Sequence, residues 1–236
     1  MIVFGCLCSL QDCAASKHSI FKQGLLLTFM IICITGTPGA GKTTLALLLA
    51  RHIPALYIDA NALMIKEKRY VSFDKARKTH IINPLEFKKR LSREIQRFKE
   101  AQERLQEKEN LQPTYTLYSD AKQHLDSFFD ALAKEHSLSF NNLRTKLVKM
   151  RLNRELAGSF SHPLMLIIDS HLSPMLMPRE IDYCFVVETS LTTLSKRLKS
   201  RQYGALKRFE NLQAEAFESS RGEAEDAGHK IILVRT

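Results

Sequence analysis

The sequence is poor in several residue types, and each shortage excludes a class of protein. Its 236 residues contain no Trp, 9 Gly and 7 Pro, which is too few for a low-complexity linker or a collagen-like chain. Cysteine is scarce and unevenly placed, which argues against a secreted disulfide scaffold and favours a reducing compartment, so we expect a cytoplasmic protein. The five cysteines are Cys6, Cys8, Cys13, Cys33 and Cys184.

Long hydrophobic runs are missing as well. The apolar stretch Leu25 to Ile34 is far too short to span a bilayer. No basic region precedes an apolar run of signal-peptide length. We therefore predict no membrane partner.

The composition otherwise suits an ordinary globular domain, with 44% hydrophobic and 25% charged residues. Lys and Arg number 35 against 25 Asp and Glu, which gives a net charge of +10. Such an excess favours anionic partners such as nucleotides or RNA.

Residues 1–29 precede the first strand pattern and are expected to be an N-terminal extension, with the domain spanning residues 30–236 and Met30 as the natural start. Cys6, Cys8, Cys13 and His18 could be named as a zinc site. Their spacing matches no common set of zinc ligands, so the extension is the preferred interpretation.

Five continuous apolar runs predict buried parallel strands, and helical patterns separate them, which indicates an α/β fold with βαβ crossovers. The runs are Ile31 to Ile34, Ala55 to Asp59, Leu164 to Asp169, Tyr183 to Glu188 and Lys230 to Val234.

Between the second and third runs the pattern predicts an all-helical insertion over residues 91–158. Pro113 is expected to end its first helix, Ser119 to cap a second and Ser139 a third, which Gly158 stops. Its Lys and Arg could form an RNA-binding surface, but they alternate with Glu, so a solvated face is the preferred interpretation.

The strongest motif lies directly after the first strand. Gly36 to Thr43 fits G-x-x-x-x-G-K-T without a mismatch, between a predicted strand and a helix that continues to about His52. Glycines let backbone N–H groups surround a phosphate at a helix N-terminus. Lys42 supplies a positive charge and the Thr43 hydroxyl a Mg²⁺ ligand, so we expect a nucleoside triphosphate site.

Two further features belong with a phosphate site. Asp169 ends the third apolar run, where a Mg²⁺ carboxylate of such folds belongs, although it could merely cap a turn, and His171 follows two residues later. After the fourth run, basic residues crowd a helix–loop–helix, where they could neutralise phosphate charge or form a solvated face. They are Lys196, Arg197, Lys199, Arg201, Lys207 and Arg208.

Together these residues resemble the adenylate kinase isoenzyme 6 family of small nucleoside monophosphate kinases. Four stretches carry the resemblance, over somewhat more than half of the chain. They are ITGTPGAGKTT (34–44), a segment at 65–85 with Phe73-Asp74, Arg77 and the start of INPLEF (82–87), the D-x-H motif within IDSHLSPML (168–176), and the lid-like LSKRLKSRQYGALKRFENLQAEAF (194–217).

The resemblance implies a P-loop NTPase-type parallel sheet of five strands in the order 2-3-1-4-5, and a monomer. It implies phosphoryl transfer between ATP and AMP or another nucleoside monophosphate, with ATPase activity and Mg²⁺. It also implies a role in late maturation of the small ribosomal subunit, through a small-subunit ribosomal protein and pre-ribosomal RNA.

Carried over by position, Asp169 and His171 organise Mg²⁺ and the attacking group, with the monophosphate side at 59–90 and the lid at 200–210. Arg201 is the lid arginine and a catalytic residue with Lys42. The implied ATP ligands are Gly39, Gly41, Lys42, Thr43, Thr44 and Arg201.

The chain departs from the family at three places. Gln202 replaces a lid glycine, the insertion has no counterpart, and the sequence ends at Thr236, before the loop that helps to hold adenine in the family. Two other functions are therefore considered: an ATPase switch in ribosome assembly, and a small-metabolite kinase of the same fold.

Overall fold

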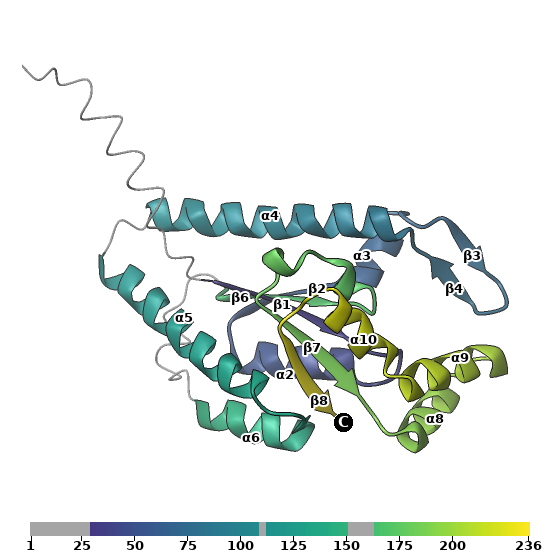
Figure 1. Cartoon of the computed structure of the whole chain (residues 1–236). Coiled ribbons are helices and arrows are strands. Elements are labelled where there is room, and N and C mark those ends of the chain that lie inside the picture. Colours follow the sequence, from purple (N-terminus) through teal and green to yellow (C-terminus); the bar gives the residue numbers. More distant parts are fainter. Residues whose placement is uncertain (1–28, 109–111, 151–162) are drawn as a thin grey trace, which may run out of the picture.

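The computed structural model describes residues 29–108, 112–150 and 163–236. The candidate zinc ligands, almost all of the expected N-terminal extension and Gly158 lie outside these residues. The α/β fold class is confirmed: a parallel sheet lies between two layers of helices (Figure 1).

The main sheet has the strand order β2-β6-β1-β7-β8-β5, and every pairing within it is parallel. Its strands are β1 (Met30–Thr35), β2 (Ala55–Asp59), β5 (Leu138–Ser139), β6 (Met165–Asp169), β7 (Tyr183–Glu188) and β8 (Ile231–Arg235). The five longer strands follow the predicted order 2-3-1-4-5. The count of five is corrected to six, because β5 pairs with the edge of β8 and two residues are too short for a periodic signal.

Two groups of helices cover the faces of the sheet. Helices α2 (Lys42–His52), α5 (Gln112–Ala133) and α6 (Phe140–Met150) share one apolar cluster with Met30, Ile32 and Ile34 of β1. The helices of the opposite face pack on Ile31 and Cys33. They are α3 (Ala60–Lys66), α4 (Pro84–Lys108) and α10 (Ser219–Asp226).

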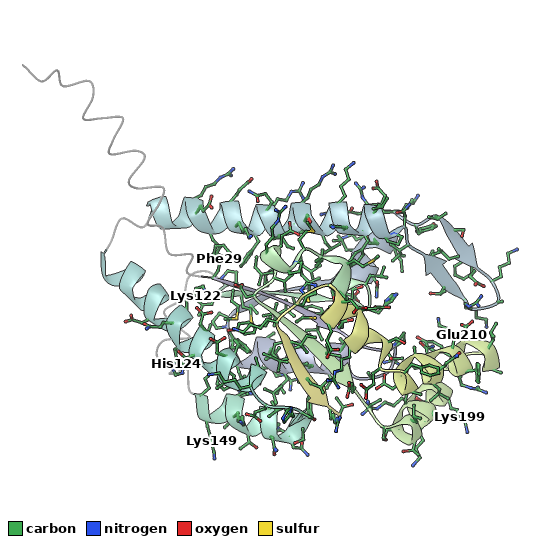
Figure 2. The ribbon with its side chains drawn as sticks, in the orientation of Figure 1. Phe29, Lys122, His124, Lys149, Lys199 and Glu210 are labelled. Atoms are coloured by element: carbon green, nitrogen blue, oxygen red, sulfur yellow. The ribbon has the colours of Figure 1, made fainter. Side chains whose placement is uncertain are left out.

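Alternate residues of β1 thus face opposite layers, and all of them are buried, as expected for a strand covered on both sides. Phe29, directly before β1 and labelled in Figure 2, is 3% exposed. Its ring meets that of Phe98 of α4 edge to face, with centroids 5.3 Å apart. Cys33 and Cys184 are buried register partners on β1 and β7.

The predicted helical insertion, residues 91–158, differs from its prediction at three places. Helix α5 begins at Gln112, so Pro113 lies in the first turn of that helix, where proline is tolerated, and does not end the preceding one. Ser119 is inside α5 and therefore caps nothing. Ser139 does cap α6, because its Oγ accepts a hydrogen bond from the Asn142 amide at 3.1 Å. Strand β5 also means that the segment is not entirely helical.

Smaller elements surround the carboxyl edge of the sheet. A hairpin of β3 (Ser72–Asp74) and β4 (Thr79–Ile81) projects between α3 and α4, and it lies on the same side of the molecule as α8 (Leu191–Ser200) and α9 (Ala205–Ala216) (Figure 1). Short 3-10 turns occupy Ser173–Met175 and Pro178–Glu180.

The turn between α8 and α9 contains Gln202, with a φ of 56°. This left-handed conformation strains a residue that has a Cβ. A glycine would adopt this backbone conformation without strain, whereas Gln202 adopts it at some cost.

None of the helices in the described ranges is both long enough and apolar enough to cross a bilayer.

We predict that Phe129→Ala lowers the free energy of unfolding by about 3–5 kcal/mol. Phe129 is fully buried between α5 and the sheet, with its ring 5.4 Å from Tyr183 and 5.7 Å from Phe185, so truncation leaves a cavity. Urea unfolding measures the change. Phe217→Ala is the matched control, because Phe217 is 73% exposed and its loss should cost less than about 0.5 kcal/mol. Equal losses in the two variants would contradict this packing.

Candidate active site

The phosphate loop joins β1 to α2 and depends on glycine at defined positions. A Cβ at Gly36 would lie 2.3 Å from the Val187 carbonyl oxygen, so no other residue fits there. Gly41, the N-cap of α2, has a φ of 117°, and Gly39 also has a positive φ. The loop therefore reaches the helix N-terminus in a conformation that presents backbone amides to an anion.

Lys42 turns back into this loop. Its Nζ donates hydrogen bonds to the carbonyl oxygens of Gly36 at 2.7 Å and Thr37 at 3.2 Å. Burial of the ammonium lowers the pKa of Lys42 to about 8, and the positive charge of Arg201 adds to this, while Asp169 opposes it. The lysine is thus a poorly solvated positive charge inside the loop.

Asp169 is the carboxylate beside the loop. The parallel register places it opposite Ile34 of β1 and Asp59 of β2, at the carboxyl edge of the sheet, where ligands bind in open α/β folds. Its Oδ2 accepts hydrogen bonds from Thr43 Oγ1 at 2.8 Å and the Tyr57 hydroxyl at 3.1 Å. Burial raises the pKa of Asp169, although the Thr43 hydrogen bond and the Lys42 charge oppose the shift.

His171 lies two residues beyond Asp169, next to the first turn of α3. Its Nδ1 is 3.5 Å from Asn61 Nδ2, and Asn61 Oδ1 in turn accepts a hydrogen bond from Ser170 Oγ at 3.1 Å. Partial burial and the positive charges of Lys42 and Lys207 lower the pKa of His171 to about 4. The ring is therefore neutral at pH 7, although the residue is exposed.

Two residues from the C-terminal part of the chain, Arg197 and Thr236, bind the carbonyl oxygens of the phosphate loop. Arg197 of α8 donates from Nη1 to the carbonyl oxygens of Ala40 at 2.9 Å and Gly39 at 3.2 Å. Thr236, after β8, donates from Oγ1 to the same Ala40 oxygen at 2.7 Å and accepts from Arg197 at 3.0 Å. These contacts fix the loop carbonyls on the side away from Lys42.

Arg201 and Thr44 are less firmly placed. Arg201 is the exposed C-cap of α8, and its side chain makes no hydrogen bond or ion pair with the described residues. It nevertheless lies close enough to Lys42 for its charge to lower the lysine pKa. Thr44 is exposed in the first turn of α2.

The hairpin and α9 meet through an ion pair. Arg77 of the hairpin turn donates from Nε to Glu210 Oε2 at 2.9 Å and from Nη2 to Oε1 at 2.5 Å. A third bond, from Nη1 to Asp74 Oδ2, is 2.8 Å long. Figure 2 shows Glu210 on α9 at the side that the hairpin occupies.

These residues fit a magnesium-bound triphosphate. A hydroxyl oxygen and a carboxylate oxygen, from Thr43 and Asp169, lie 2.8 Å apart beside the loop amides, and both are ligand types that Mg²⁺ prefers. Among residues 29–108, 112–150 and 163–236, no group of three or more His, Cys, Asp or Glu could hold a metal ion.

The structure thus brings Gly39, Gly41, Lys42, Thr43 and Asp169 together, with His171 beside them and Arg201 near enough to act on Lys42 electrostatically. Sequence analysis named Arg197 only among the basic residues that could neutralise phosphate charge, and it singled out none of Tyr57, Asn61 and Thr236. Arg197 had a usable signal, since it precedes Arg201 by one helical turn on the same face. Tyr57 and Asn61 depend on strand register, which no local pattern reveals.

Known proteins match parts of this chain. Proteins named "Putative adenylate kinase" from Saccharolobus islandicus and Saccharolobus solfataricus are 35% identical over 66 residues, which is 28% of this chain and 35% of each relative. One from Sulfurisphaera tokodaii is 35% identical over 54 residues, 23% of this chain and 29% of that relative. The chain therefore spans about a third of the length of the curated relatives it matches.

A solved structure and a family model match more of the chain. The crystal structure of TT1252 from Thermus thermophilus covers 88% of this chain and 89% of its own, at 18% identity and a TM-score of 0.35, a likeness too weak to bear on the site. A family model described as an AAA domain, AAA_18, matches residues 32–218, which include the phosphate loop, Asp169 and Arg201. The chain has a P-loop NTPase-like fold and belongs to this AAA domain family.

Proposed function

We propose that this protein is a nucleoside monophosphate kinase that transfers the terminal phosphoryl group of ATP to AMP. One observation carries the proposal: the Thr43–Asp169 hydrogen bond joins an intact phosphate loop to the carboxylate at the end of β6. The partial matches to relatives named as adenylate kinases support a nucleotide kinase over other phosphate-loop proteins.

The chain's own residues have distinct roles in this proposal. The loop amides and Lys42 bind the triphosphate, and Arg197 keeps the loop carbonyls turned outward. Arg201, which is exposed near Lys42, neutralises charge on the transferring group. Mg²⁺, when bound through Thr43 and Asp169, offsets negative charge on the phosphates.

His171 and Asn61 act on the acceptor in this scheme. The imidazole is neutral at pH 7, so it can accept a hydrogen bond from an acceptor hydroxyl or water without repelling the cationic loop. Positioning and charge neutralisation supply most of the rate acceleration in phosphoryl transfer. No covalent intermediate on the protein is required.

The same residues would also support hydrolysis, with water in place of AMP. An ATPase switch that acts on a ribosomal protein–RNA complex is therefore the second candidate, and His171 beside Asp169 is the feature that favours it. The ribosomal role itself depends on the resemblance alone.

Incubation with ATP, Mg²⁺ and a panel of acceptors separates these functions. A kinase forms two ADP for each AMP consumed, whereas a switch releases phosphate at a rate that AMP does not change. A small-metabolite kinase would phosphorylate another member of the panel instead of AMP.

We predict that Lys42→Ala lowers turnover by about 100- to 1,000-fold, because the transferring phosphoryl group loses the positive charge that Lys42 places beside it. Steady-state assays of ADP formation and phosphate release measure the effect. Lys149→Ala, which removes an exposed lysine of α6, is the control and should keep normal turnover. Near-normal activity in Lys42→Ala would overturn the assignment.

We predict that ATP binding weakens as the pH rises above 8. The pKa of Lys42 is lowered to about 8, so the free protein loses this positive charge at higher pH while the triphosphate stays fully ionised. Calorimetric titrations between about pH 7 and pH 9.5 should show roughly 30-fold weaker binding at the upper end. Lys42→Arg keeps its charge over this range and should flatten the profile. A flat wild-type profile would show that Lys42 does not bind the triphosphate through its charge.

A further inference from the structure

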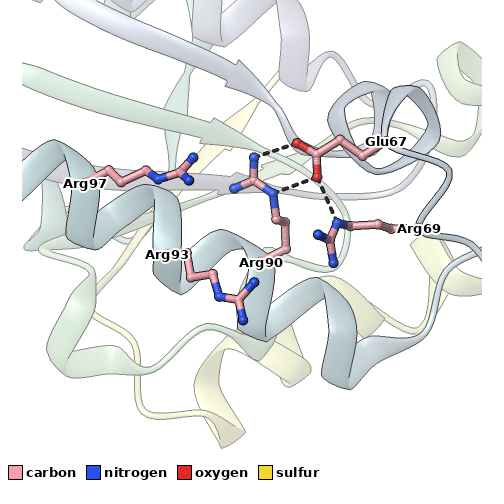
Figure 3. Close-up of a pocket in the computed structure, with 5 residues that line it drawn as sticks. All are labelled: Glu67, Arg69, Arg90, Arg93 and Arg97. Carbon is pink, nitrogen blue, oxygen red and sulfur yellow. Dashed lines mark hydrogen bonds and ion pairs between the residues drawn. The ribbon is translucent and has the colours of Figure 1, made fainter.

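Four arginines and one glutamate line a pocket of about 360 Å³ at the junction of α3 and α4 (Figure 3). Glu67 and Arg69 lie directly after α3, before the β3–β4 hairpin. Arg90, Arg93 and Arg97 follow the hairpin on α4, and their spacing of three and four residues aligns them along one face of the helix. The pocket therefore lies at the base of the hairpin and shares no residue with the phosphate loop.

Arg90 is the residue of this pocket whose side chain is fixed in place by hydrogen bonds. It is only 8% exposed, although it carries a full charge. Its Nε and Nη2 donate to the two Glu67 oxygens at 2.7 and 2.6 Å, and its Nη1 also pairs with Glu94. Arg69 Nε donates to Glu67 at 2.9 Å. These hydrogen bonds, above all those from Arg90, lower the pKa of Glu67 to about 2, so it stays ionised at any physiological pH.

The charge of the pocket wall is not balanced. Four guanidinium groups face one carboxylate, because Glu86 and Glu94 contact the arginines but do not line the cavity. Glu67 is already committed to Arg90 and Arg69. Arg97 pairs with Glu94 at 2.8 Å yet its side chain is 69% exposed, and no described carboxylate lies within ion-pair distance of Arg93.

Unused hydrogen-bond donors accompany this charge. Each guanidinium has five N–H groups, and Glu67 and Glu94 occupy three of those on Arg90. Figure 3 shows Arg93 and Arg97 after Arg90 along α4, without a bond to any residue drawn. Clustered guanidinium groups repel one another, so an anion placed among them relieves repulsion and gains bidentate hydrogen bonds.

We propose that this arginine pocket binds a phosphate monoester or inorganic phosphate, at a site separate from the phosphate loop. A planar, forked guanidinium matches phosphate oxygens better than a lysine does. The volume suits a small phosphorylated ligand. The binding site goes beyond the proposed kinase function and does not require it.

Calorimetry at constant ionic strength tests the site with inorganic phosphate, AMP and adenosine on four forms of the full chain. Arg93→Ala/Arg97→Ala should weaken phosphate and AMP binding at the pocket by at least about tenfold, because each side chain is exposed at the rim and removes charged donors without disturbing the Arg90–Glu67 pair. Lys42→Ala should leave this binding in place, so failure of the kinase proposal and failure of the pocket are distinguishable. Lys89→Ala/Arg104→Ala, which removes the same charge from exposed positions of α4, is the matched control.

Each outcome of the calorimetry either supports or overturns the phosphate site. Binding of AMP tighter than that of phosphate identifies a nucleotide as the source of the phosphate group, equal binding identifies free phosphate, and both support the site. Adenosine binding as tight as AMP overturns it, because the pocket then recognises no phosphate. Unchanged phosphate binding in Arg93→Ala/Arg97→Ala also overturns it and leaves the arginines as a structural network. The proposal is also overturned, in favour of an RNA contact, if phosphate and AMP do not bind at the pocket but a single-stranded RNA binds the protein and loses this binding in Arg93→Ala/Arg97→Ala.

Discussion

The hydrogen bond between Thr43 and Asp169 is the interaction on which the candidate site depends. It joins the first turn of α2 to the end of β6, and Tyr57 extends it to β2. The bond can form because β1, β2 and β6 are parallel, and their register places Asp59 and Asp169 side by side at the carboxyl edge of the sheet. A shift of one residue in β6 would turn the Asp169 side chain to the other face of the sheet.

The phosphate loop is restrained from two sides by different chemistry. On its inner side Lys42 binds the Gly36 and Thr37 carbonyls, and on its outer side Arg197 and Thr236 bind the Ala40 carbonyl. Because these three carbonyl oxygens already accept hydrogen bonds from side chains, the backbone N–H groups of the loop remain available to bind an anion. Preorganisation of this kind means that little of the binding energy is spent on ordering the loop.

Local patterns predicted the phosphate loop, the five longer strands and the cap at Ser139, because each depends on residues close in sequence. The strand order came from the family resemblance. The helix boundary near Pro113 was missed, since proline fits both the end of a helix and the first turn of the next. Tyr57 and Asn61 were missed because their partners are more than 100 residues away. The arginine spacing on α4 was visible, but Glu67, which organises it, lies 23 residues before Arg90.

The ion pair between Arg77 and Glu210 gives the molecule a property that its core does not have. Both side chains are substantially exposed, at 40% and 37%, so dissolved ions weaken their attraction. Separation of the hairpin from α9 requires this pair to break. The rate at which these two segments part should therefore rise with the ionic strength of the medium, so the hairpin and α9 would separate faster in salt-rich surroundings.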